Sequence, residues 1–132
     1  HNHGCVTRTG DDVLRILDTI DSPYFSHILD TGQYVGSPGA SGADRSADAA
    51  EQLYNSISTS AHRAVHVRAK FYRVASGVEE WLDYPRILEI LKGVDYNGWM
   101  SVVYEGWEAE PSGTAVPKAV AHLRTLLADA DM

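Results

Sequence analysis

Three short apolar segments of this chain carry side chains that can do acid–base or electrostatic chemistry. Asp30 stands near the end of residues 24–32, and Glu105 near the end of residues 98–106. Between them, residues 64–72 alternate apolar and polar side chains, and the polar ones are His66, Arg68 and Lys70. A carboxylate can act as a general base, an imidazole can carry a proton, and a guanidinium or ammonium group can stabilise an oxyanion. Together these groups could move a proton, provided that the fold brings them together.

Helical and strand patterns alternate along the chain. Apolar residues recur at helical spacing in residues 10–20, 46–57, 81–93 and 115–130, and the three segments above are typical of strands. In residues 81–93 we expect Asp83 as the N-cap, Pro85 in the first turn and Gly93 at the end. Strands that alternate with helices predict right-handed βαβ units and a parallel sheet covered by helices.

The alternation also predicts which way each strand faces, and ligands of parallel sheets bind at the carboxyl ends of the strands. We expect one set of side chains to face the helices: Val65, Val67, Ala69, Met100, Val102 and Tyr104. The opposite face should then carry His66, Arg68, Lys70, Ser101, Val103 and Glu105. In a closed barrel this second face would point at the barrel axis.

The overall composition excludes several classes of protein. With 132 residues and 44% hydrophobic content, the chain can form one domain, and it has no apolar stretch that approaches the roughly 20 residues of a membrane span. Eleven Lys and Arg against 18 Asp and Glu give a net charge of −7, which disfavours a nucleic-acid partner. The single Cys5 allows no internal disulfide, and no signal sequence is evident, so a cytoplasmic location is expected.

Five motifs carry a resemblance to a known family. The segments "NHG", "LDTGQ", "HVRAK", "LDYPRILEIL" and "YNGWMSVVYEG", in this order and spacing, resemble the xylose-isomerase-like sugar phosphate isomerase/epimerase barrels. The resemblance implies an α/β fold, the C-terminal half of a (β/α)8 TIM barrel, from the end of strand 5 ("HNHG") through helix 8. Residues 1–132 would be a single partial TIM-barrel domain, because a complete barrel needs about 250 residues. We therefore expect the chain to be a fragment, a split subunit, or a half-barrel that must pair with another half.

The resemblance also implies an activity, proton abstraction next to the carbonyl of a sugar or sugar phosphate, and a divalent metal held by two Glu, one Asp and one His. Only Asp30 matches that ligand set. His1 stands where the first Glu is expected, Arg68 where the His is expected and Val103 where the last Glu is expected.

Three interpretations of this altered set remain open. An altered metal site could use Asp30, His1 and His66, together with His3, and imidazoles suit Zn²⁺ or Mn²⁺. Alternatively, Glu105, on the same face as Val103, supplies a missing carboxylate. In the third, no metal binds, and Arg68 with Lys70 holds a phosphate or carboxylate group of the ligand.

The residues receive the following predicted roles. Glu105 is the general base, His66 a ligand or proton carrier, and Asp30 a metal ligand or orienting acid. Substrate binding is assigned to Arg68, Lys70, His3 and Trp107, the last as an apolar wall for a sugar ring. A structural alternative is a buried ion-pair network, because two neighbouring cations repel each other unless Asp30 and Glu105 lie between them.

The sequence leaves two other functions open and predicts a mode of assembly. One is a non-catalytic half-barrel subunit that completes another chain. The other, an abasic-site endonuclease, shares the barrel but is disfavoured by the charge of −7. A partial barrel would leave two open sheet edges and an apolar inner face, which predicts self-association or pairing with a complementary half-barrel.

Overall fold

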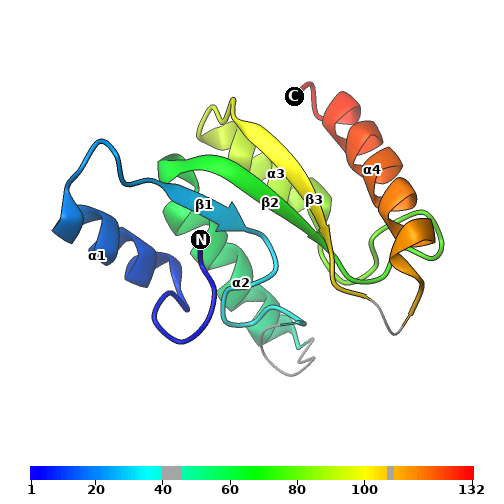
Figure 1. The fold of residues 1–132 in the computed structure, drawn as a ribbon, viewed down its shortest axis with the longest axis horizontal. Helices are drawn as coiled ribbons and strands as arrows, with labels where there is room; N and C mark the ends of the chain where they lie inside the picture. The colour runs from blue at the N-terminus through cyan, green and yellow to red at the C-terminus, as the bar shows by residue number, and fades with distance from the viewer. Residues whose placement is uncertain (40–45, 107–108) are drawn as a thin grey trace.

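The computed structural model describes residues 1–39, 46–106 and 109–132. Helices and strands alternate in these residues, as Figure 1 shows. They are α1 (Gly10–Ile20), β1 (His27–Asp30), α2 (Ala47–Ser60), the short 3-10 helix η1 (Ala61–Arg63), β2 (Ala64–Phe71), α3 (Tyr84–Gly93), β3 (Trp99–Tyr104) and α4 (Ser112–Asp129). The predicted alternation is confirmed, although β1 and β3 are shorter than their apolar segments. None of the described helices is long and apolar enough to cross a membrane.

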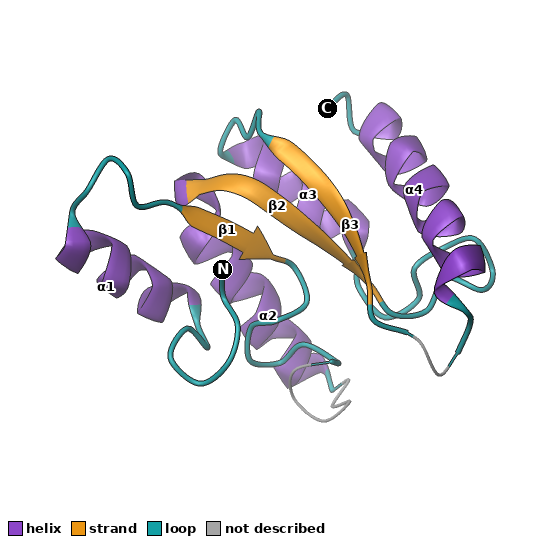
Figure 2. Cartoon of the chain, in the orientation of Figure 1, coloured by secondary structure: helices purple, strands orange, loops and turns teal. Residues whose placement is uncertain are grey.

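The three strands form one parallel sheet in chain order, β1-β2-β3 (Figure 2). Asp30 of β1 lies beside Arg68 of β2, and Arg68 lies beside Ser101 of β3. The predicted α/β class and parallel sheet are therefore confirmed. All three strands end at the same edge of the sheet, so their carboxyl ends form one surface.

Local signals explain where the helices begin. At α1, the Thr9 hydroxyl accepts from the Asp12 N–H while the Asp12 carboxylate accepts from the Thr9 N–H, which is a capping box. At α3, Asp83 is the N-cap and accepts from the Arg86 N–H, as predicted. Helix α4 begins earlier than predicted, directly after Pro111.

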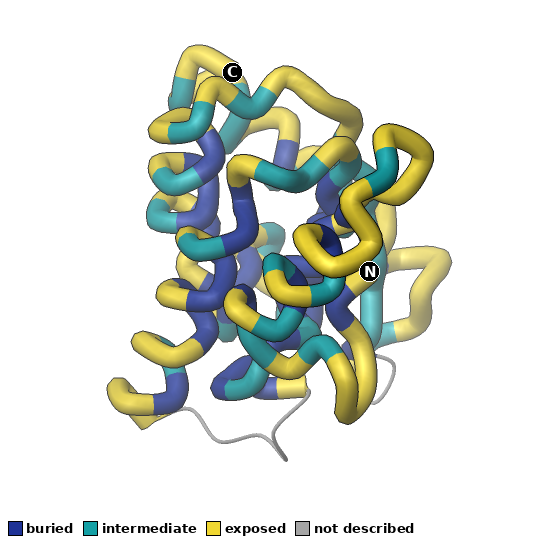
Figure 3. The backbone as a smooth tube through the Cα atoms, turned by 90° about the vertical axis from the view of Figure 1, so that its left-hand side faces the viewer, coloured by how far each residue is buried: buried dark blue, intermediate teal, exposed yellow. Residues whose placement is uncertain are grey.

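One face of the sheet packs against the helices. The side chains of Leu29, Val67, Ala69 and Phe71 are fully buried in a core to which all four α-helices contribute. In Figure 3 the buried stretches of the backbone, in dark blue, lie toward the interior of the molecule, and exposed stretches, in yellow, lie around them. Val65, which is predicted on the same side of β2 as Val67 and Ala69, is 56% exposed, because it lies at the amino-terminal start of β2, at the rim of the core.

The other face of the sheet is left open by the helices, and α2 and α3 lie behind the strands in Figure 1. The strand register places these side chains on the open face: Ile28, Asp30, His66, Arg68, Lys70, Trp99, Ser101 and Val103. The predicted apolar inner face is wrong, since polar and charged side chains fill its middle and its carboxyl end.

The chain start is not a strand. Residues 1–3 have no regular secondary structure, so the predicted strand end at "HNHG" is wrong as a backbone element. Instead, the buried Asn2 side chain donates from Nδ2 to the Asp30 carbonyl (2.8 Å) and accepts at Oδ1 from the Asp30 N–H (2.7 Å). One side chain thus pairs with the outer edge of β1, where a neighbouring strand would use its backbone.

Candidate functional site: an ion-pair cluster at the strand ends

Lys70 is the centre of a cluster of four charged side chains. Its own side chain is 0% exposed. Its Nζ lies 3.3 Å from Asp30 Oδ2, on the neighbouring strand, and makes a still closer contact with Glu105 Oε1, directly after β3. The prediction that Asp30 and Glu105 lie beside the paired cations is confirmed in this geometry.

Arg68 is the second cation of the cluster and the more accessible one. Its Nε lies 3.4 Å from Asp30 Oδ2, and 27% of its side chain is exposed. Its Nη1 lies 2.9 Å from Nε2 of His1. Because a guanidinium group only donates, His1 must accept through Nε2, which assigns the neutral tautomer with its proton on Nδ1.

Asp30 is the buried anion that both cations share. Its Oδ1 accepts a hydrogen bond from the Gly32 N–H (3.0 Å). Its Oδ2 has ion-pair contacts with Arg68 and Lys70 but no hydrogen bond among the described residues, because neither contact has hydrogen-bond geometry. Burial raises the pKa of Asp30, while Lys70, the Gly32 N–H and Arg68 act in the opposite direction. Asp30 Oδ2 is thus compensated by the charges of Lys70 and Arg68 and not by a hydrogen bond.

Glu105 is the carboxylate that solvent can reach. Its side chain is 27% exposed. Oε1 contacts the Lys70 ammonium group, and Oε2 accepts from Gln33 Nε2 at 3.1 Å. Both oxygens are held, so the carboxylate plane is fixed at the carboxyl end of the sheet.

A second layer of contacts holds Lys70 in place. The Tyr84 hydroxyl donates to the Lys70 carbonyl (2.5 Å), and the Lys70 N–H donates to Thr31 Oγ1 (2.9 Å). A Cβ atom at Gly32 would overlap the Lys70 side chain and the Tyr72 hydroxyl. Glycine at this position therefore gives the lysine room to reach Asp30.

The remaining predicted site residues lie outside this cluster. His66 lies one row nearer the amino-terminal ends, and its Nε2 is 2.9 Å from Ser101 Oγ. His3 is exposed, and its ring meets that of His1 edge to face with centroids 5.4 Å apart. Trp107 lies outside the described residues. The roles of His66, His3 and Trp107 stay predictions.

The donor set at this cluster does not fit a metal ion. Within residues 1–39, 46–106 and 109–132, no three His, Cys, Asp or Glu side chains are grouped so that they could hold one. His66 is engaged with Ser101, and His1 is turned to Arg68. The Lys70 ammonium group lies between the two carboxylates, in the position that a metal cation would take.

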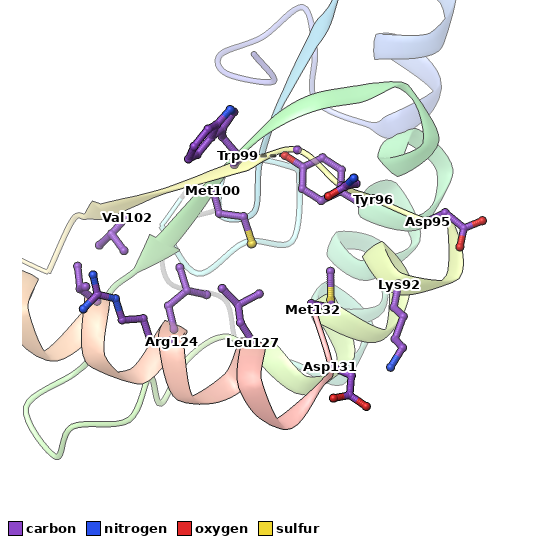
Figure 4. A pocket seen from close by; sticks show the side chains of 14 residues that line it. Lys92, Asp95, Tyr96, Trp99, Met100, Val102, Arg124, Leu127, Asp131 and Met132 are labelled. Atoms are coloured by element: carbon purple, nitrogen blue, oxygen red, sulfur yellow. Dashed lines mark hydrogen bonds between the residues drawn. The ribbon is translucent and has the colours of Figure 1, made fainter.

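A hollow of a different kind lies away from this cluster. A groove of about 780 Å³ runs between β3 and α4, and Figure 4 shows Met100 and Val102 pointing toward Leu127 across it. Lys92, Asp95, Arg124 and Asp131 also line it. No charged cluster like that of Lys70 is found among its described lining residues, so we place the candidate chemistry at the strand ends.

Sequence reasoning missed the supporting residues. Asn2 and Gln33 both contact the cluster, yet neither belongs to a recognisable charge pattern. The only available signals were the position of Gln33 in the turn after Asp30 and of Asn2 between two histidines.

A comparison of the chain with known protein families finds no match, and a search of curated proteins finds no relative.

Proposed function

We propose that this chain is part of a sugar or sugar phosphate isomerase or epimerase that abstracts a proton next to a carbonyl group. The observation that carries this proposal is the cluster of Asp30, Arg68, Lys70 and Glu105 on the open sheet face. It lies at the carboxyl ends of parallel strands, where α/β folds bind their ligands. Carboxylates beside cations can remove a proton and stabilise the oxyanion that forms.

Glu105 is the proposed general base. It is the accessible carboxylate of the cluster, and Lys70 and Gln33 fix its orientation. Proton transfer by a positioned side chain contributes about 10²- to 10⁴-fold to a rate. Asp30, which is fully buried, orients the two cations and does not reach a substrate.

Arg68 is the proposed site for an anionic part of the substrate. Its guanidinium group is partly exposed on the open face and can make two parallel hydrogen bonds to a phosphate or carboxylate. Lys70 is buried, so the role proposed for it is an indirect one, through Glu105. The direct contact between Lys70 and the substrate that the sequence suggests stays a prediction.

The strand arrangement supports the half-barrel part of the proposal. Three parallel strands in chain order, with helices packed on one face and charged side chains on the other, are what a segment of a (β/α)8 barrel contains. The charged face would then line the barrel axis at its carboxyl end.

Deuterium exchange tests the proposed chemistry. The protein is incubated in D₂O with a panel of aldoses, ketoses and their phosphates, and NMR follows loss of the proton next to the carbonyl. We expect exchange with at least one sugar, and about a 100-fold or greater loss in Glu105→Gln. Glu89→Gln, at an exposed position on α3, is the matched control and should exchange like the unmodified protein. No exchange with any sugar, or normal exchange in Glu105→Gln, would contradict the proposal.

Arg68→Met tests the anion subsite, because methionine keeps much of the volume and removes the charge. Phosphorylated or carboxylated sugars should raise the melting temperature of the unmodified protein and lose this effect in the variant, while neutral sugars behave alike in both. Normal turnover of the phosphorylated substrate by Arg68→Met would refute this subsite.

A non-catalytic half-barrel subunit is the second candidate. It is favoured by the outer edge of β3, which has no strand partner among the described residues and borders the groove shown in Figure 4. Unpaired strand edges are sites of association. Sedimentation velocity should then show self-association, or a stable complex with a complementary half-barrel, and a monomer that shows deuterium exchange by itself would refute this candidate.

A further inference from the structure

Two carboxylates from two different strands converge on one buried point, and a lysine occupies it. Asp30 comes from β1 and Glu105 directly follows β3, while Lys70 reaches between them from β2. Without a cation between them, two carboxylates this close together would repel each other. Converging carboxylate oxygens are also the ligands that hard divalent cations prefer.

The charges of the cluster balance without a metal ion. Asp30 and Glu105 contribute two negative charges, and Lys70 and Arg68 contribute two positive charges. A divalent ion added to this set would leave two uncompensated positive charges in a site where Asp30 and Lys70 are fully buried, and burial of uncompensated charge is strongly unfavourable. A metal would also have to approach within about 2.0–2.6 Å of the carboxylate oxygens, which is the space that the ammonium group fills.

We propose that the Lys70 ammonium group is the resident cation of this site and takes the position of a divalent metal ion, so that the site needs no metal. Lys70 is a positioning residue: it holds Glu105 through Oε1 and neutralises Asp30. The inference concerns the site of the proposed function, but its test needs no turnover.

Lys70→Met gives the direct test, because it removes the ammonium group and leaves both carboxylates in place. The variant should acquire a site for a divalent cation. We expect Mn²⁺ to raise its melting temperature by several degrees and to bind with one ion per chain in a calorimetric titration. The unmodified protein should show neither effect at the same Mn²⁺ concentration.

Two further variants make the result specific. Lys118→Met is the matched control, because Lys118 pairs with one carboxylate among the described residues, Glu110, and its removal should create no metal site. In the double variant Lys70→Met with Asp30→Asn, one of the two carboxylates is lost, and the acquired Mn²⁺ binding should disappear.

Several outcomes would overturn the inference. One is stoichiometric binding of Mn²⁺ or Zn²⁺ to the unmodified protein that is lost in Asp30→Asn. Another is a folded Lys70→Met variant that binds no divalent cation. If Lys70→Met folds only when Mn²⁺ is present, the inference is supported. If the variant folds neither with nor without Mn²⁺, the titration of the unmodified protein with Mn²⁺ decides whether the inference stands.

The test separates this inference from the proposed function. If no variant exchanges a sugar proton but Lys70→Met acquires a metal site, the isomerase proposal fails and the resident cation stands. If exchange by the unmodified protein requires added metal, the proton chemistry stands and the resident cation fails.

Discussion

The cluster at the strand ends and the groove between β3 and α4 differ in almost every property. The cluster is filled: Lys70 and Asp30 are fully buried, and every charge contacts an opposite charge. The groove is hollow, and its walls combine apolar side chains such as Met100 and Leu127 with scattered polar ones (Figure 4). A large hollow and a cluster of paired, reactive groups thus lie in different parts of the same fold.

The largest expected effect is on the charge network itself. Asp30→Asn leaves the buried Lys70 with one carboxylate and removes the anion next to Arg68, so we expect the free energy of unfolding to fall by about 4 kcal/mol in chemical denaturation. Asp18→Asn breaks the exposed pair with Arg63 and should cost less than about 1 kcal/mol. Equal effects of the two variants would show that the cluster is not a buried network.

The second effect is a pH dependence of stability caused by His27, at the amino-terminal end of the sheet. Burial lowers the pKa of His27 from 6.5 to about 4, with a smaller contribution from the N-terminal charge. Between these values the unfolded chain binds the proton and the folded chain does not, so stability falls as pH drops from about 6.5 to about 4, by about 3 kcal/mol. Asp30 and Glu79, whose pKa values are raised by burial, act in the opposite direction above pH 3.8–4.5.

The difference between two pH profiles isolates the contribution of His27. In His27→Gln, denaturation between pH 4 and 7 should lack this loss of stability, while His62→Gln, at an exposed position, should keep it. Parallel profiles for His27→Gln and the unmodified protein would contradict the prediction.

The third effect separates the two regions directly. Leu123 lies on α4, is buried and lines the groove, so Leu123→Ala should lower the free energy of unfolding by about 2–3 kcal/mol. Exchange of the sugar proton should stay unchanged, because the groove takes no part in the proposed chemistry. A variant that is stable but has lost exchange would move the site from the strand ends to the groove.

The smallest effect concerns the orientation of Glu105. Gln33→Met removes the hydrogen bond to Oε2, which is worth about 1 kcal/mol, and should slow exchange by less than about tenfold with little change in stability. Gln52→Met, at an exposed position on α2, is the control. An unaltered exchange rate in Gln33→Met would show that Lys70 alone fixes the carboxylate.

Much of this architecture follows from the sequence. Helical spacing, the N-cap Asp83 and the strict alternation of residues 64–72 predict the elements, the parallel sheet and the two faces of β2, because these patterns reflect local sterics and the burial of apolar side chains. They also predict that Asp30 and Glu105 lie at the ends of the strands beside Lys70; the structure has Asp30 as the last residue of β1 and Glu105 directly after β3. The exposure of Val65 could not be predicted, because alternation shows the side of a strand that a residue faces and not where the covering helices end.

The pairing and the burial of the charged side chains depend on how the folded chain packs. Lys70 is fully buried and Arg68 is partly exposed, although both lie on the same face of one strand, and the alternation of residues 64–72 does not distinguish them. Asn2 and Gln33 reach the cluster from segments whose side-chain directions no periodicity fixes. Residues far apart in the chain meet only when the sheet has formed. The folded sheet also fixes the distance between each cation and each carboxylate, and this distance sets the strength of their interaction.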